Sequence, residues 1–145
     1  MKNCLACGTT KPANSFSKNK LRPDGLQTQC KECCKNRRAT SLYKAKHLIS
    51  TAKYRSDVVT ITWQWVKEKI DKGFCELTGL PFDLNTQPGF SKNPYAPSID
   101  RIDSKIYKYT PENTRIVLHF VNQALNEYDQ ETALPILKAM VDKIK

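Results

Sequence analysis

The sequence predicts an α+β protein in three parts: a small N-terminal metal-binding module, a basic helix and a larger C-terminal domain. Two cysteine pairs lie near the N-terminus, and a basic stretch without glycine or proline follows them. In the C-terminal half, short apolar segments alternate with turn residues. We place the three parts at residues 1–36, 37–57 and 58–145. A chain of 145 residues has room for a modest core.

Four cysteines predict the metal-binding module. Cys4 and Cys7 form one CxxC pair, Cys30 and Cys33 form a second, and 22 residues separate the pairs. Each CxxC turn directs two thiolates at one ion, and two turns complete the tetrahedral sulfur site that Zn²⁺ prefers. The CxxC register favours Cys33 over its neighbour Cys34. We expect the zinc to be structural, because the intervening residues offer little core.

An iron-bound, rubredoxin-like electron carrier is the alternative interpretation of the cysteine pattern. The charge distribution favours zinc and a nucleic-acid partner instead. Residues 1–56 contain 13 basic and two acidic residues, whereas residues 57–145 contain 11 basic and 12 acidic ones. All of the net charge of +10 therefore lies in the N-terminal part, which is typical of a protein that binds a polyanion.

The basic stretch after Cys33 is predicted to be one amphipathic helix extending to about Arg55. Leu42, Ala45, Ile49 and Ala52 recur at helical spacing and define its apolar face. We expect the basic residues of the remaining surface to contact the phosphate backbone of DNA: Arg37, Arg38, Lys44, Lys46, Lys53 and Arg55.

The first part of the C-terminal domain is predicted to contain a short helix, two strands and a loop. Thr60 or Thr62 would cap a helix that ends at Gly73. Residues 74–82 are predicted to form a strand, a turn and a second strand, and residues 85–97 a long loop.

Two helices are predicted to complete the chain. One begins within residues 114–122 and runs to about Tyr128. The tail from Asp129 carries apolar residues at helical spacing and places Pro135 in a first helical turn. We expect these apolar residues to make core or dimer contacts.

The C-terminal half carries a specific motif. PSIDRID at residues 97–103 leads into YTPEN at 109–113 and TRIVLHFVN at 114–122, and CELTGLPF at 75–82 precedes them. This order resembles the HNH endonuclease family, in particular its phage-type members. The double CxxC module in front of it is similar to that of compact HNH restriction enzymes. The resemblance extends from Cys4 to Asn126.

The resemblance implies a ββα-metal finger that hydrolyses phosphodiester bonds of double-stranded DNA with Mg²⁺ or Mn²⁺. Asp100 matches the metal-binding carboxylate of the family, and Asn122 matches the second metal-binding position. Asn113 matches the central asparagine, which ties the connecting loop together. The cation would neutralise charge that develops on the phosphoryl oxygens and the leaving oxygen.

Arg101 departs from the commonest pattern of the family, in which a histidine acts as general base. Arginine stays protonated near neutral pH, so Arg101 is better suited to hold the scissile phosphate. The candidates for the base are His119, three residues before Asn122, and His47 on the basic helix. Tyr109 is a weaker candidate, because tyrosine ordinarily titrates near pH 10.

Two other functions remain open. The missing histidine permits a DNA-binding protein on an HNH scaffold that no longer cleaves. The charge alone permits RNA, although no sheet with exposed aromatic pairs is evident. We expect no membrane association, since no apolar run approaches the roughly 20 residues of a membrane span. The resemblance implies a cytoplasmic protein of a phage or bacterium, and a homodimer would favour double-strand cleavage over nicking.

Overall fold

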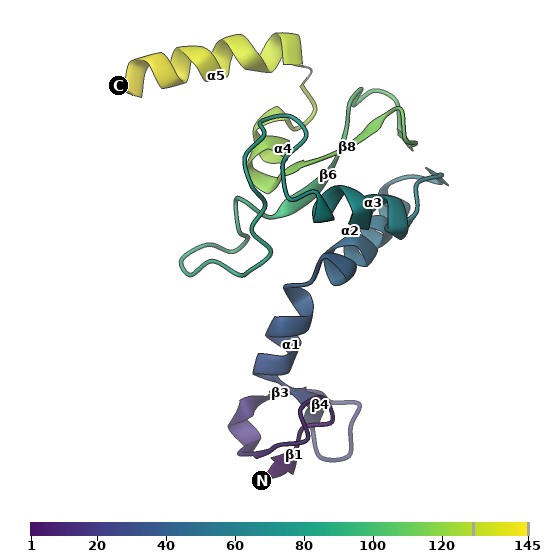
Figure 1. The fold of residues 1–145 in the computed structure, drawn as a ribbon, viewed down its shortest axis with the longest axis vertical. Helices are drawn as coiled ribbons and strands as arrows, with labels where there is room; N and C mark the ends of the chain where they lie inside the picture. The colour runs from purple at the N-terminus through teal and green to yellow at the C-terminus, as the bar shows by residue number, and fades with distance from the viewer. Residues whose placement is uncertain (129, 145) are drawn as a thin grey trace. The chain divides into compact units, whose positions relative to one another are not determined.

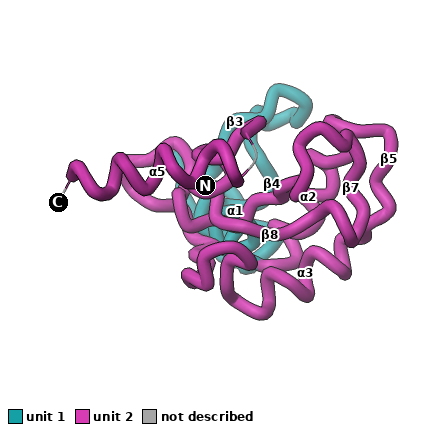
Figure 2. The backbone as a smooth tube through the Cα atoms, turned by 90° about the horizontal axis from the view of Figure 1, so that it is seen from above, with its two compact units in different colours: residues 1–40 teal, residues 41–145 magenta. Residues whose placement is uncertain are grey.

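The computed structural model describes residues 1–128 and 130–144 (Figure 1). The chain divides into two compact units, residues 1–40 and residues 41–145 (Figure 2). Helices and small two-stranded sheets occur in both units, so the α+β prediction is confirmed.

The first unit is built around its cysteines. Cys4, Phe16 and Cys30 form its buried core, with Leu26 and Cys33 packed against them. The surrounding elements are two antiparallel pairs, a 3₁₀ turn and one helix: β1 (Lys2–Asn3) with β2 (Thr10–Lys11), η1 (Ala13–Ser15), β3 (Phe16–Lys18) with β4 (Leu26–Cys30), and α1 (Lys31–Arg38).

The predicted single basic helix is instead two helices, α1 (Lys31–Arg38) and α2 (Ser41–Arg55). The chain leaves helical geometry at Ala39, whose ψ is 12°. The hydroxyl of Thr40 donates to the carbonyl of Arg37 at 2.8 Å. Such a local hydrogen bond competes with helix continuation, which explains an interruption that the absence of glycine and proline did not predict.

The α2 helix belongs to the core of the second unit. It packs against α3 (Trp63–Asp71), and its apolar face is buried there. The buried cluster combines this face with residues from α3 and the strands: Ala45, Leu48, Ile49, Ala52, Ile61, Val66, Ile70, Ile99, Tyr109 and Ile116. The basic segment is therefore more than a connection, since about half of its apolar residues hold the C-terminal unit together.

The short helix predicted before Gly73 is present as α3. The hydroxyl of Thr62 accepts from the backbone N–H of Trp65 at 3.2 Å and so caps the helix. Gly73 follows its end with a φ of +88°, a conformation that favours glycine. Trp63 and Trp65 both pack against the main core from partly buried positions.

The strand pair predicted over residues 74–82 is wrong: the only pairing there is one bridge between Phe74 and Pro81. The backbone N–H of Gly79 donates to the carbonyl of Cys75, and the N–H of Cys75 donates to the carbonyl of Leu80, both at 2.9 Å. These bonds close a tight turn that leaves too few residues on either side to form a ladder.

The central strands of the second unit are β6 (Pro97–Arg101) and β8 (Thr114–Leu118), which pair antiparallel. A smaller parallel pair joins β5 (Val58–Val59) to β7 (Lys108–Tyr109). The helix predicted to begin within residues 114–122 begins only at His119, as α4 (His119–Leu125). The residues that precede it include the β-branched Thr114, Ile116 and Val117, which favour a strand, and they pair with β6. The α4 helix lies beside both strands (Figure 1).

The last helix is α5 (Gln130–Ile144). Asp129, where the helical tail was expected to begin, lies outside the described residues. Pro135 stands in the second turn rather than in the first, because α5 begins at Gln130. Ala133 is buried, whereas most of the apolar residues of α5 are exposed: Leu134, Ile136, Met140, Val141 and Ile144. Across residues 1–128 and 130–144, no helix combines the length and apolar character of a membrane span.

Candidate functional site

The four predicted zinc ligands converge in the first unit. The sulfur atoms of Cys4, Cys7, Cys30 and Cys33 all lie within 4.8 Å of one another. The Sγ atoms of Cys4 and Cys33 are 3.9 Å apart. A tetrahedron with Zn–S bonds of about 2.3 Å has edges of about 3.8 Å, so the cluster fits a zinc ion. Cys34 lies outside it, as the CxxC register predicts, with its Sγ 3.9 Å from the carbonyl of Gln29.

Backbone N–H groups stabilise thiolates in this cluster. The N–H of Cys30 donates to the sulfur of Cys4 at 3.2 Å, and this bond is the main reason that the pKa of Cys4 falls to about 6. The hydrogen bond to Cys30, together with burial, raises the pKa of Cys33 to about 12. Without a cation, the Cys33 thiol therefore stays protonated near neutral pH, and a divalent ion would favour its thiolate.

The second unit contains a cleft of about 660 Å³. It brings together predicted site residues from three elements: Lys44, His47 and Arg55 from α2, Asp100 and Arg101 from β6, and His119 and Asn122 from α4. Tyr109 also lines it. The loop predicted over residues 85–97 contributes Thr86, Phe90 and Lys92.

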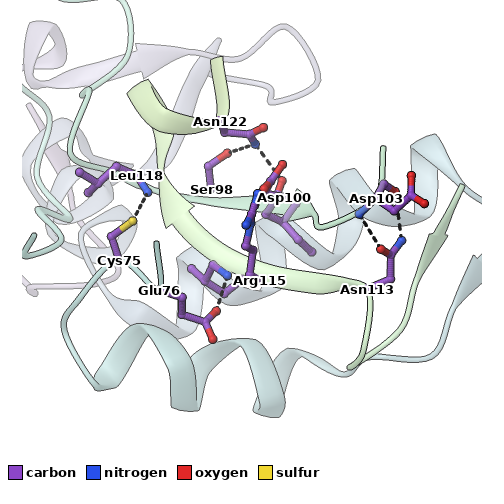
Figure 3. Close-up of polar contacts among 11 residues, drawn as sticks. Cys75, Glu76, Ser98, Asp100, Asp103, Asn113, Arg115, Leu118 and Asn122 are labelled. Atoms are coloured by element: carbon purple, nitrogen blue, oxygen red, sulfur yellow. Dashed lines mark hydrogen bonds and ion pairs between the residues drawn. The ribbon is translucent and has the colours of Figure 1, made fainter. Parts of the chain in front are cut away.

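Asp100 is a buried carboxylate at the end of β6. Its Oδ2 accepts a hydrogen bond of 2.7 Å from Nε of Arg115, the residue opposite it on β8 (Figure 3). The two side chains are 7% and 12% exposed, so this ion pair is largely shielded from water. Burial raises the pKa of Asp100, and Arg115 opposes that shift.

Asn122 faces the same strand from α4. Its Nδ2 donates to the hydroxyl of Ser98 at 2.8 Å and to the carbonyl of Ile99 at 2.9 Å (Figure 3). These bonds fix the amide and leave its Oδ1 as the atom able to accept from a ligand or bind a cation.

Asn113 does not line the cleft but holds the loop between β6 and β8. Its Oδ1 accepts from the N–H of Asp103 at 2.9 Å, and its Nδ2 donates to the carbonyls of Ile106 and Lys108, both at 3.1 Å. Figure 3 shows the first of these bonds. These hydrogen bonds tie both ends of the loop to one side chain.

The guanidinium of Arg101 is held by aromatic rings. Its Cζ lies 4.5 Å from the ring centroid of Tyr107 and 5.7 Å from that of Tyr109. Cation–π contact of this kind orients the charge without neutralising it, so Arg101 can still bind an anion in the cleft. Tyr109 is buried and its ring contacts Arg101, which argues against Tyr109 as the general base.

The two histidines lie in different environments. His119 begins α4 and is partly buried, and burial, followed by the charge of Lys92, lowers its pKa. His47 is exposed on α2, with its ring stacked on Tyr43 at 6.4 Å between centroids. Both histidines line the cleft, so both remain candidates for the general base.

The predicted DNA-binding residues are dispersed. Lys44 is half-buried in the cleft, where desolvation lowers its pKa. Lys46 lies over the ring of Trp63 at 5.2 Å, and exposed Lys53 does not line the cleft. Arg37 and Arg38 belong to α1 in the first unit and line a separate groove there.

Sequence reasoning assigned no role to Arg115 or Ser98. Arg115 is the cross-strand partner of Asp100, and Ser98 is the hydrogen-bond partner of Asn122. The antiparallel register of β6 and β8 would have predicted the Asp100–Arg115 pair, had residues 114–118 been recognised as a strand.

Comparison with known proteins gives one distant likeness. No protein-family model matches the chain, and no curated protein matches it. One similar solved structure is described as "An extraordinary mechanism of DNA perturbation exhibited by the rare-cutting HNH restriction endonuclease PacI". Its identity is 17% and its TM-score 0.46, over 99% of this chain and 95% of that one. A likeness at this level carries no weight in assigning a function.

Proposed function

We propose that this protein is a metal-dependent DNA endonuclease of the HNH type. One observation carries the proposal: Asp100, Arg101, His119 and Asn122, from a strand and the helix that follows its partner strand, line a single cleft. An acid, an amide, an imidazole and a guanidinium together supply what phosphodiester hydrolysis requires.

Asp100 and Asn122 would hold the divalent ion. A buried carboxylate and an amide oxygen are hard oxygen donors, which suit Mg²⁺ or Mn²⁺. When bound, such an ion stabilises negative charge on the phosphoryl group and on the leaving oxygen. Arg115 keeps the carboxylate of Asp100 oriented through its Nε–Oδ2 hydrogen bond.

The remaining side chains would handle the phosphate and the proton. Arg101, held by its two tyrosines, binds a non-bridging phosphate oxygen. A neutral imidazole from His119 or His47 accepts the proton of the attacking water. The lowered pKa of His119 keeps its imidazole neutral at pH 7.

The basic surfaces would position the duplex. Lys44 and Arg55 on α2 line the cleft and would contact phosphates next to the scissile bond. The first unit, with its structural zinc ion, contributes nine basic residues against two acidic ones and would extend the contact along the DNA.

A homodimer would allow both strands to be cut. The exposed apolar residues of α5 support self-association, because an unpaired apolar helix face is unfavourable in water. Light scattering of the purified protein would give twice the monomer mass of 16.6 kDa.

A non-cleaving DNA-binding protein is the second candidate. The observation that favours it is the arginine at position 101, where the commonest pattern has the general base. Both candidates predict salt-sensitive DNA binding, and only the nuclease predicts product.

Supercoiled plasmid cleavage distinguishes the two. We expect nicked or linear DNA with Mg²⁺ or Mn²⁺, none without added ion, and none from Asp100→Ala. Asp57→Ala, which removes an exposed carboxylate of the same unit, serves as the matched control and should cleave normally. DNA binding without product under every ion would leave the non-cleaving function.

A further inference from the structure

The first unit contains a polar groove whose uncharged side chains have no role in the function proposed above. It measures about 310 Å³ and lies where the β3–β4 ribbon meets α1. Its lining includes Ser17, Gln27 and Gln29 and the cations Lys31, Arg37 and Arg38, together with Thr28 and Cys34. We propose that this groove reads base edges in the major groove of duplex DNA, an inference that rests on the proposed function.

Strand alternation creates the surface. Leu26 and Cys30 turn one face of β4 toward the zinc cluster, so Gln27 and Gln29 belong to the opposite face. On β3, Phe16 is buried in the same core, and Ser17 therefore joins the two glutamines. The zinc site thus fixes which side chains of the ribbon face outward.

The chemistry of these side chains differs from that of a simple phosphate-binding surface. Phosphate contacts need only donors or positive charge, whereas a carboxamide both donates and accepts hydrogen bonds. Glutamine pairs in this way with N6 and N7 of adenine in the major groove. The sulfur of Cys34 lies 4.0 Å from Oε1 of Gln29.

The dimensions of the ribbon match those of DNA. Alternate residues of a strand are about 6.6–6.8 Å apart. Successive base pairs rise by about 3.4 Å, so two base-pair steps span about 6.8 Å. The major groove is about 12 Å wide and admits a two-stranded ribbon. Gln27 and Gln29 would therefore contact bases that are separated by one intervening base pair.

Positive charge flanks the two glutamines. Lys31 and Arg38 lie on α1, and the Nζ of Lys31 is anchored by a 2.8 Å hydrogen bond to the carbonyl of Asn14. Residues 1–40 carry nine basic and two acidic side chains, a formal charge of +7, which a zinc ion with four thiolates reduces to +5. These charges complement the phosphates on either side of the groove.

The test is selection of bound duplexes from a randomised library. The full-length, zinc-loaded protein is used without Mg²⁺ or Mn²⁺, so that DNA is bound and not cut. We expect wild type to prefer A·T pairs at two positions with one base pair between them, by roughly 5- to 100-fold each. Gln27→Ala should abolish the preference at one position only, and Gln29→Ala at the other.

Two controls separate this effect from others. Asn36→Ala removes an exposed carboxamide of the same module that does not line the groove, and its sequence profile should match wild type. Arg38→Ala should weaken binding to all sequences alike and reduce the salt dependence by about one phosphate contact. Zinc content measured for every variant shows that the module is folded.

Unchanged profiles for both glutamine variants would overturn the inference, as would a wild-type protein that binds DNA without sequence preference. If such a protein still cleaves plasmid in an Asp100-dependent way, the nuclease proposal survives alone. If the expected profile appears without cleavage under any ion, the groove assignment stands and the nuclease proposal fails. A protein that neither binds nor cleaves duplex DNA contradicts both.

Discussion

The two units of this chain reach a folded state by different means. Three side chains, two of them cysteines, make the buried core of the first unit, whereas ten buried residues form the main cluster of the second. A core of three residues is too small to offset the conformational entropy of about 40 ordered residues. We therefore propose that a metal ion completes the fold of the first unit, whereas in the second unit a metal ion would serve catalysis.

Removal of zinc is expected to have the largest effect, and only on the first unit. Cys7→Ser should unfold residues 1–40, because zinc binding contributes about 10–16 kcal/mol to the folding of such modules. In backbone NMR spectra, the amide signals of that unit would lose their chemical-shift dispersion, while those of the second unit would keep theirs. Cys34→Ser is the control and should keep both the ion and the fold. Loss of both units together would contradict the division drawn here.

Loss of the general base comes next and tests the chemistry of the second unit. We expect either His119→Gln or His47→Gln, and not both, to lower kcat/KM by about 10²–10⁴-fold. Burial lowers the pKa of His119 below its ordinary value of 6.5, so the imidazole is mostly neutral at pH 7. If His119 is the base, activity rises through that pKa and is level at pH 7. Full activity in both variants would contradict a histidine base.

Asn113 tests the internal support of the second unit. Asn113→Ala removes a buried amide that joins the loop at Asp103, Ile106 and Lys108, and should cost about 2–3 kcal/mol of unfolding free energy. Urea unfolding measures this loss. Gln123→Ala, an exposed amide on α4, should change stability by less than about 0.5 kcal/mol. An equal effect of the two substitutions would show that the loop network is not a determinant of stability.

The smallest effect concerns the basic face of α2. Arg55 lines the cleft and Lys53 does not, although both are exposed. Arg55→Ala should weaken DNA binding by about 1 kcal/mol or less and reduce the salt slope by about one. Lys53→Ala should have less effect. If the Lys53 variant loses more, the DNA follows the helix surface rather than the cleft.

Local chemistry explains which features could be predicted from the sequence. The CxxC spacing predicted the cysteine cluster, because two such turns have few ways to share an ion. The cap at Thr62 and the glycine at position 73 predicted α3 for equally local reasons. Asp100 and Asn122, identified through a motif, line one cleft, and their roles remain proposals.

Features that depend on long-range pairing were missed. Residues 114–118 form a strand because β6 pairs with them, and the segment alone did not distinguish that outcome from the start of a helix. The Asp100–Arg115 ion pair was missed for the same reason. The break at Ala39 and Thr40 includes a side-chain hydrogen bond from Thr40 to Arg37, which hydrophobic periodicity does not detect.

One measurement tests the central claim most directly: that Asp100 serves cleavage and not DNA binding. The same labelled duplex is used with wild type and with Asp100→Asn, to measure affinity without Mg²⁺ and single-turnover cleavage with Mg²⁺. We predict affinities within about twofold of each other and a cleavage rate at least about 10³-fold lower for the variant. Cleavage by Asp100→Asn at a rate close to that of wild type would contradict the account.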